Sequence, residues 1–78
     1  MYYVYIIKLP DDTLYIGYST DLRTRIKKHQ QEKHFKRLIY YEAYQAKQDA
    51  VARERQLKKY KSAWGHLKVR IKRSIKGV

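Results

Sequence analysis

The spacing of hydrophobic and polar positions changes several times along this chain. Residues 2–9 (YYVYIIKL) are rich in Tyr, Val and Ile without clear alternation, which is typical of a strand covered on both faces. In the following LPDDT, Pro10 suits the second position of a turn, and TLYIGYS then repeats the strand pattern. The pattern predicts a β-hairpin over residues 2–18.

Helical spacing begins after the hairpin. Leu22, Ile26 and His29 fall on one stripe of a helix, and Ser19 or Thr20 can cap its start. Arg25 lies at the edge of this stripe, one turn before His29. The segment is therefore expected to be a helix that packs on the hairpin.

The remainder of the chain predicts one more strand and two more helices. RLIYYEAY at 37–44 reads as the strand, and 47–60 and 62–75 read as the helices. The last helix would carry Trp64 and Ile71 on its apolar side, although its LKVRI also alternates like a strand. The order β-β-α-β-α-α predicts a single α+β domain over 1–78, a small three-stranded antiparallel sheet with helices packed on it.

Charge narrows the class of partner. The chain has 19 Lys and Arg against 7 Asp and Glu, a net charge of +12. Residues 47–78 hold eleven of the basic and two of the acidic side chains, and no acid follows Glu54. A polyanion, and above all nucleic acid, is the expected partner; the alternative is a solvated charged surface. The predicted nucleic-acid-binding residues are Lys58, Lys68, Arg70, Lys72 and Arg73.

The composition also bears on location. There is no cysteine, and the apolar start MYYVYIIKL is short, lacks a basic leader and runs into PDD. It therefore reads as neither a signal peptide nor a membrane span. We expect a soluble, cytoplasmic protein with no disulfide and no thiolate metal site.

One carboxylate stands out in the second predicted helix. Ala50, Val51 and Leu57 define its apolar stripe, and Glu54 falls near the centre of that stripe. Burying an ionised carboxylate costs several kcal/mol unless a cation compensates for it. Two partners could compensate the charge of Glu54: Arg25 in a structural ion pair, or a divalent metal.

Two of the nine tyrosines can meet on the hairpin. If the loop between the strands has an odd number of residues, Tyr5 and Tyr15 project from the same face; an even number would separate them. Most of the tyrosines are expected to be core aromatics with the hydroxyl at the edge. A tyrosine can take a proton from water only if nearby positive charge depresses its pKa, normally about 10.

The combined candidates suit phosphodiester hydrolysis. The set offers phenols, a guanidinium, an imidazole and one carboxylate, and comprises Tyr5, Tyr15, Arg25, His29 and Glu54. A metal on Glu54 would act as Lewis acid, and the forked donor of Arg25 would neutralise charge on the phosphorus. A single inward carboxylate favours one metal ion over two.

These residues resemble the GIY-YIG endonuclease superfamily, which includes homing endonucleases, some restriction enzymes and the N-terminal nuclease of the bacterial excision-repair incision subunit. The first element of the family motif corresponds to YVY at 3–5, with its glycine replaced by Tyr3. The second, YIG at 15–17, is intact and includes Gly17 as the structural glycine. LIYYEAY and ARERQLKKY are similar to segments of small stand-alone members.

The resemblance implies roles for individual residues. Tyr5 or Tyr15 would activate or orient water, with Tyr5 favoured. Arg25 would bind the scissile phosphate, His29 would assist proton transfer or position the nucleophile, and Glu54 would hold one Mg²⁺ or Mn²⁺. Several members have an asparagine twelve residues after the glutamate, and this chain has His66 there.

The resulting hypothesis is a metal-dependent DNA endonuclease that nicks by hydrolysis, in repair or recombination. A chain of this length has little room for a separate reader of base sequence, so we expect it to recognise branched, damaged or single-stranded DNA, or to depend on a targeting protein. The alternative is a basic nucleic-acid-binding protein that does not cut. A weaker one places the amphipathic segment 62–75 on an anionic membrane. Neither a membrane partner nor a small-molecule cofactor is expected.

Overall fold

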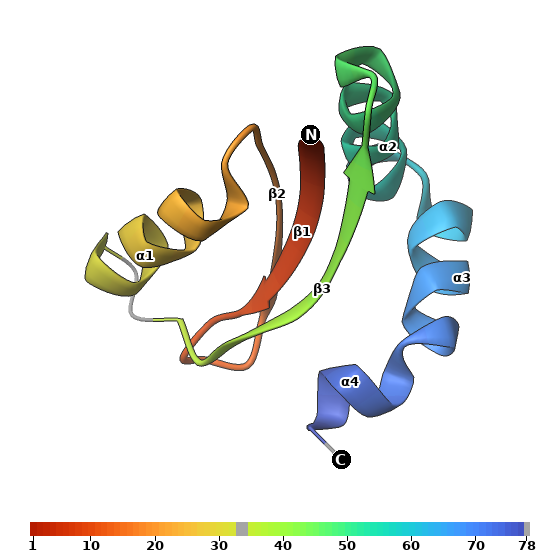
Figure 1. Cartoon of the computed structure of the whole chain (residues 1–78). Coiled ribbons are helices and arrows are strands. Elements are labelled where there is room, and N and C mark those ends of the chain that lie inside the picture. Colours follow the sequence, from red (N-terminus) through yellow and green to blue (C-terminus); the bar gives the residue numbers. More distant parts are fainter. Residues whose placement is uncertain (33–34, 78) are drawn as a thin grey trace.

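A computed structural model describes residues 1–32 and 35–77 of the chain. Its elements in chain order are β1 (Tyr2–Lys8), β2 (Leu14–Ser19), α1 (Leu22–Glu32), β3 (Arg37–Tyr44), α2 (Lys47–Lys59), α3 (Lys61–Arg70) and α4 (Lys72–Lys76) (Figure 1). The predicted α+β class and the order β-β-α-β-α-α are confirmed. The predicted helix over 62–75 is divided into α3 and α4.

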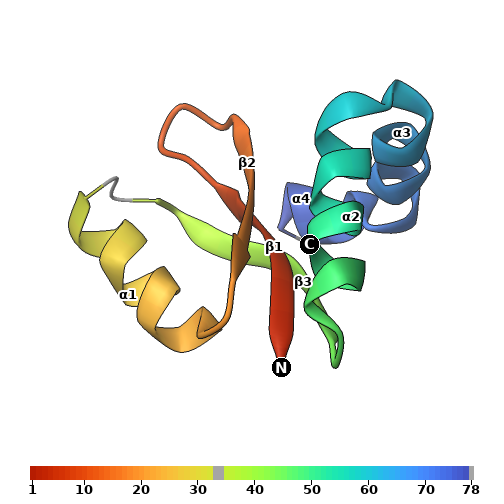
Figure 2. The ribbon, with the colours of Figure 1, turned by 90° about the horizontal axis from the view of Figure 1, so that it is seen from above.

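The three strands form an antiparallel sheet in the order β2-β1-β3, so β1 is the central strand. Helix α1 lies on one side of this sheet and α2, α3 and α4 lie on the other (Figures 1 and 2). Four consecutive residues of β1, Val4 to Ile7, are buried. The absence of alternation in β1 therefore has its expected cause, because both faces of the strand are covered.

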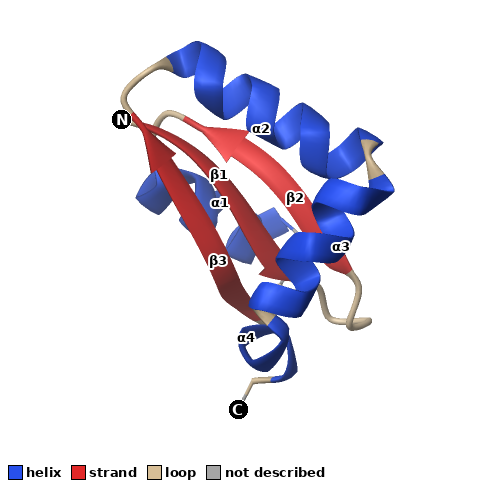
Figure 3. Ribbon diagram, turned by 90° about the vertical axis from the view of Figure 1, so that its right-hand side faces the viewer, coloured by secondary structure: helices blue, strands red, loops and turns tan. Residues whose placement is uncertain are grey.

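The main core lies between the sheet and α2–α4. It contains Val4 and Ile6 from β1, Ala50 and Leu57 from α2, and Leu67 and Ile71 from α3 and its end. Figure 3 shows α2 and α3 in front of the sheet on this side. The odd-numbered residues of β1 point instead toward α1, because side chains alternate along a strand.

The turn and the first helix are stabilised by short polar side chains. The backbone N–H of Asp12 donates to the carbonyl of Leu9 at 2.9 Å, so Pro10 occupies the second position of the turn, as predicted. Helix α1 is capped by Asp21, whose carboxylate accepts from the backbone N–H of Thr24 at 3.2 Å. Our expectation of Ser19 or Thr20 as the cap was wrong, because the helix starts at Leu22 and the residue before it can reach the third N–H.

The break between α3 and α4 falls at Ile71, whose backbone (φ −112°, ψ 23°) departs from helical values. Beyond it, α4 turns back toward the sheet (Figure 1). Ile75 packs against the core, and Arg37 on β3 donates to the carbonyls of Ser74 and Ile75 at 2.6 Å each. In the part of the chain that the structure describes, no helix has the length and apolar character needed to cross a membrane.

Candidate active site

The two tyrosines of the hairpin project from the same face of the sheet. The strands are joined by the five residues 9–13, an odd number, and the register pairs Tyr5 with Gly17 and Ile7 with Tyr15. The ring centroids of Tyr5 and Tyr15 are 6.4 Å apart. The two phenols therefore face α1 together.

Helix α1 brings His29 onto these phenols. Its imidazole Nε2 lies 2.6 Å from the hydroxyl oxygen of Tyr5, a buried hydrogen bond whose direction depends on the tautomer of the imidazole. The centroid of the His29 ring is 5.4 Å from that of Tyr15 and 6.5 Å from that of Phe35. His29 is the buried residue of α1 among the described positions, so the predicted stripe of Leu22, Ile26 and His29 ends in the site.

Gly17 leaves the space that the Tyr5 ring occupies. A Cβ atom built on Gly17 would overlap Cζ and the hydroxyl oxygen of Tyr5. Because Tyr5 and Gly17 are directly opposed on neighbouring strands, only a residue without a side chain lets the end of this ring lie over β2. The geometry gives a steric reason for a glycine at this position.

Burial dominates the acidity of Tyr5. Desolvation raises the pKa of Tyr5 to about 12, with further upward contributions from Tyr15 and Glu54 and an opposing one from Arg25. The Arg25 guanidinium lowers the pKa of Tyr5, as nearby positive charge should, but burial outweighs it, so Tyr5 does not meet the condition of a depressed pKa. Tyr5 is therefore a neutral phenol near pH 7.

Arg25 and Glu54 approach the tyrosines from opposite sides of the sheet. Arg25 is an exposed residue of α1, and Glu54 and Lys58 come from α2. A Glu54 oxygen lies 3.4 Å from Nζ of Lys58, and that Nζ is 5.9 Å from the centroid of the Tyr15 ring. Charges on Arg25 and Glu54 both act on Tyr5. The cation next to Glu54 is thus Lys58, and no ion pair between Glu54 and Arg25 occurs among the described residues.

A metal ion would find one carboxylate here. No group of three or more His, Asp or Glu side chains with metal-binding geometry occurs in residues 1–32 and 35–77. Mg²⁺ commonly keeps several waters and takes one or two carboxylates together with substrate phosphates. The Glu54 side chain is 24% exposed, and its partner Lys58, at 50%, can swing into solvent. The residues present fit a single hydrated ion on Glu54.

The most enclosed carboxylate is one that the sequence did not single out. The Glu42 side chain on β3 is 15% exposed and binds Arg53 of α2 through Nε at 3.0 Å. The hydroxyls of Tyr40 and Tyr44 also donate to it. Burial raises the pKa of Glu42, but these donors outweigh it and hold the pKa below its ordinary value. The signal was the period-two run Tyr40, Glu42 and Tyr44, which places all three on one face.

His66 lies in this second region, not beside Tyr5. It lines a pocket of about 370 Å³ with Glu42, Arg53 and Arg70, on the face of the sheet that α3 covers. Its assignment as a substitute for the family asparagine stays a prediction.

The five residues predicted to bind nucleic acid are divided between two regions. Lys58 reaches Tyr15, as described above. The other four are Lys68, Arg70, Lys72 and Arg73, which lie on α3 and α4. These two helices cover the face of the sheet opposite α1 (Figure 2). Helix α1 lies on the same side of the sheet as Tyr5 and carries further cations. The charge count over 47–78 did not include them; they are Arg23, Arg25, Lys27 and Lys28.

Comparison with known proteins identifies the class. The family model of the GIY-YIG catalytic domain matches residues 1–68. The chain is 39% identical over 67 residues to a UPF0213 protein of Staphylococcus aureus strain Mu3 and to UPF0213 protein SAV0488 of strain Mu50, covering 76% of this chain and 82% of each relative. The solution NMR structure of UPF0213 protein BH0048 from Bacillus halodurans matches with a TM-score of 0.61 and 33% identity, covering 92% of this chain and 86% of that one.

The chain thus belongs to the GIY-YIG family, whose model describes a catalytic domain. Nuclease activity is the activity of this family, which suggests an endonuclease. The relatives' names state no activity.

Proposed function

We propose that this protein is a DNA endonuclease that depends on a divalent metal and nicks a strand by phosphodiester hydrolysis. One observation carries the proposal: a buried phenol, Tyr5, contacts the His29 imidazole and lies within the electrostatic reach of Arg25 and Glu54. Such a convergence of a proton acceptor, a guanidinium and a carboxylate suits a reaction at a phosphate.

The raised pKa of Tyr5 shapes the proposed mechanism. A neutral phenol can accept a proton from water only while it passes its own proton on. His29 Nε2, 2.6 Å from the Tyr5 oxygen, is placed to receive that proton. In the proposed step the water oxygen bonds to phosphorus while the bond from phosphorus to the departing oxygen breaks. The water proton goes to Tyr5, and the Tyr5 proton goes to His29. Tyr15, beside both rings, orients the water.

Arg25 and Glu54 serve the phosphate in this proposal. The guanidinium of Arg25 would donate to its nonbridging oxygens and stabilise charge that develops on them. Glu54 would hold one Mg²⁺ or Mn²⁺, which supplies Lewis acidity to the phosphate and stabilises the departing oxygen. Lys58 would leave Glu54 as the metal binds.

The test is cleavage of supercoiled plasmid and of branched DNA with Mg²⁺ or Mn²⁺. We expect wild type to convert supercoiled plasmid to the nicked form, and Glu54→Gln and Arg25→Ala to lose the activity by at least about 100-fold. Glu32→Gln and Arg55→Ala, which change exposed residues, are the matched controls. Uncut DNA in every wild-type reaction, with DNA binding intact, would refute the proposal that the protein is an endonuclease.

A non-catalytic nucleic-acid-binding protein is the second candidate. The contact between Glu54 and Lys58 favours it, because the ammonium already compensates the carboxylate. In that case Glu54→Gln would alter stability slightly and leave DNA affinity and DNA integrity unchanged. Melting of the variant with and without Mn²⁺ separates the two, since a resident metal stabilises only a chain that retains its ligand.

The setting of the activity belongs to the same proposal. We propose that residues 1–78 act as one nuclease domain in the cytoplasm, on branched, damaged or single-stranded DNA in repair or recombination. A targeting protein would supply any sequence selectivity. Activity on a panel of DNA structures, alone and in cell extract depleted of nucleases, distinguishes a structure-directed enzyme from a partner-directed one.

A further inference from the structure

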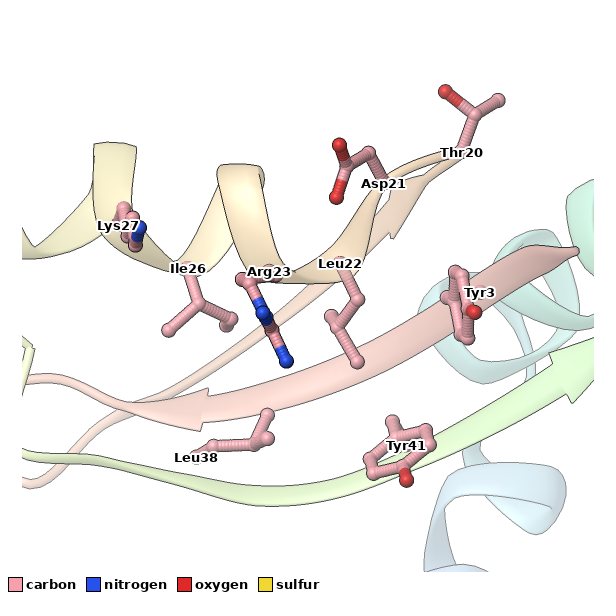
Figure 4. A pocket seen from close by; sticks show the side chains of 9 residues that line it. All are labelled: Tyr3, Thr20, Asp21, Leu22, Arg23, Ile26, Lys27, Leu38 and Tyr41. Carbon is pink, nitrogen blue, oxygen red and sulfur yellow. The ribbon is translucent and has the colours of Figure 1, made fainter.

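A groove of about 580 Å³ opens between α1 and the strands β1 and β3 (Figure 4). Tyr3 and Tyr41 form its aromatic floor, with ring centroids 6.2 Å apart and an interplanar angle of 65°. Leu22 and Ile26 project from α1 toward the strands, Leu22 nearer the rings and Ile26 above Leu38, and both are only half-buried (Figure 4). Tyr41 is 52% exposed, so much of a flat aromatic surface faces solvent inside the groove.

Two cations border this aromatic surface. Arg23 extends from α1 toward the strands, and Lys27 follows one turn later (Figure 4). Neither forms an ion pair among the described residues, whose salt bridges involve other side chains. The one carboxylate that lines the groove, Asp21, accepts hydrogen bonds from Thr24. The groove thus combines an exposed aromatic surface with positive charge, in a chain of net charge +12.

The groove adjoins the candidate active site. Tyr41 is paired directly with Tyr5 across β1 and β3, and Tyr3 is two residues before Tyr5 on the same face. Neighbouring strands lie about 4.8 Å apart, and residues two apart on a strand are separated by about 6.6 Å. A nucleotide in the groove would therefore lie beside the backbone of Tyr5, and the strand that carries it would have to run on across β1 to reach the Tyr5 hydroxyl, which lies over Gly17 of β2.

We propose that this groove binds one unpaired base of a DNA strand, stacked on Tyr41, with the flanking phosphates on Arg23 and Lys27. Every base offers a flat face to an aromatic ring, and backbone cations hold the strand without reading sequence. A base inside a duplex is stacked on its neighbours and cannot enter. The inference rests on the proposed function and gives its substrate class: strands with an unpaired nucleotide next to the scissile phosphate.

The test is a binding measurement in EDTA, which excludes cleavage. Fluorescence anisotropy would follow a labelled single-stranded thymidine oligonucleotide and a duplex of equal length. Tyr41→Ala should weaken single-strand binding about tenfold or more and leave duplex binding within about twofold. Tyr41→Phe keeps the ring and should bind as wild type. Tyr60→Ala removes a tyrosine of similar exposure, 51%, outside the groove and should also bind as wild type.

Each outcome decides the inference. Selective loss in Tyr41→Ala supports it. Unchanged single-strand binding, or equal loss on single strand and duplex, overturns it, as does a loss of equal size in Tyr60→Ala. Circular dichroism of each variant excludes misfolding, which is not expected at such an exposed side chain. A wild type that binds single strands through Tyr41 but never cuts with Mn²⁺ would refute the nuclease and retain the groove as a base-binding site.

Discussion

The hydroxyl oxygen of Tyr5 lies 2.6 Å from Nε2 of His29, and the two residues are 1% and 5% exposed. This contact joins the central strand of the sheet to α1. Because burial raises the pKa of Tyr5 to about 12, its phenol keeps its proton near pH 7. We expect that phenol to donate to Nε2, which requires the proton of a neutral His29 to sit on Nδ1.

Nitrogen-15 NMR of the His29 ring measures this directly. Nε2 should show the shift of an unprotonated, hydrogen-bonded nitrogen, and Tyr5→Phe should move that resonance. Exposed His66 provides the internal control, since its ring should not respond. A protonated Nε2 in the wild type would reverse the hydrogen bond and remove His29 as the acceptor of the Tyr5 proton.

Gly17→Ala should destabilise the fold and displace Tyr5. The added methyl would overlap the Tyr5 ring, and overpacking of this kind costs about 1–3 kcal/mol. Urea denaturation gives the free energy of unfolding. The control is Gly65→Ala in α3, where a Cβ meets nothing within 4 Å. There alanine should raise the free energy of unfolding by about 0.5–1 kcal/mol. Equal stability of the two variants would mean that Tyr5 can leave Gly17 without cost.

Much of the hairpin could be predicted because its signals are local. Strand composition, the turn chemistry of Pro10 and the odd loop together place Tyr5 and Tyr15 on one face without knowledge of the rest. The helical spacing of His29 likewise gives its inward direction. Each of these signals depends on residues within one element or in two consecutive elements.

What the sequence did not reveal depends on packing between distant elements. Glu42 gains Arg53 only when α2 lies across β3, and the pKa of Tyr5 follows from burial that no local pattern measures. Charge counting favoured the C-terminal helices, whereas the position of α1 over the sheet puts Arg23 on the same side as the site. The split of the last helix depends on contacts between α4 and β3 in the same way.

Glu42→Gln tests whether the enclosed carboxylate is structural. The change removes the charge that binds Arg53 and leaves the hydroxyls of Tyr40 and Tyr44 with a weaker acceptor. Breaking a fully buried pair costs about 3–5 kcal/mol, and for this partly exposed pair we expect about 2 kcal/mol. Glu32→Gln, at an exposed pair of 4.0 Å with Lys28, should cost less than about 0.5 kcal/mol. Thermal and urea unfolding measure the stability of both variants. Similar losses of stability would show that the Glu42 carboxylate stabilises the fold no more than an exposed one.

Stability should fall at both ends of the pH range for different reasons. Burial, the largest cause, raises the pKa of Tyr5, Tyr40 and Tyr44 to about 12, against about 10 in an unfolded chain. Their contribution to the stability of the fold is fully present below about pH 10 and is lost as pH rises to about 12. The pKa of Glu42 is lowered by its donors, chiefly Arg53, so its contribution is present above its ordinary pKa and lost as pH falls below it.

Ultraviolet absorbance of tyrosinate, recorded together with circular dichroism, checks the alkaline limb. Tyr5, Tyr40 and Tyr44 should contribute a late part of the signal that appears only as the fold is lost. Tyr40→Phe should reduce the size of that late part. Complete ionisation of all nine tyrosines in one step near pH 10, with the fold intact, would contradict the raised values.

Arg37 should control the attachment of the C-terminal helix. Its two terminal nitrogens donate to the carbonyls of Ser74 and Ile75 at 2.6 Å, and Lys8 is a second donor to the Ile75 carbonyl at 2.9 Å. Arg37→Gln removes the fork and should cost about 1–2 kcal/mol, felt mainly in α4. Hydrogen exchange should accelerate at the amides of α4, while those of β1 keep their protection. Lys36→Gln, which breaks an exposed pair with Asp12, is the neighbouring control and should leave α4 exchange unchanged. If α4 exchanges equally slowly in both variants, the packing of Ile75 and its hydrogen bond from Lys8 hold the helix in place without Arg37.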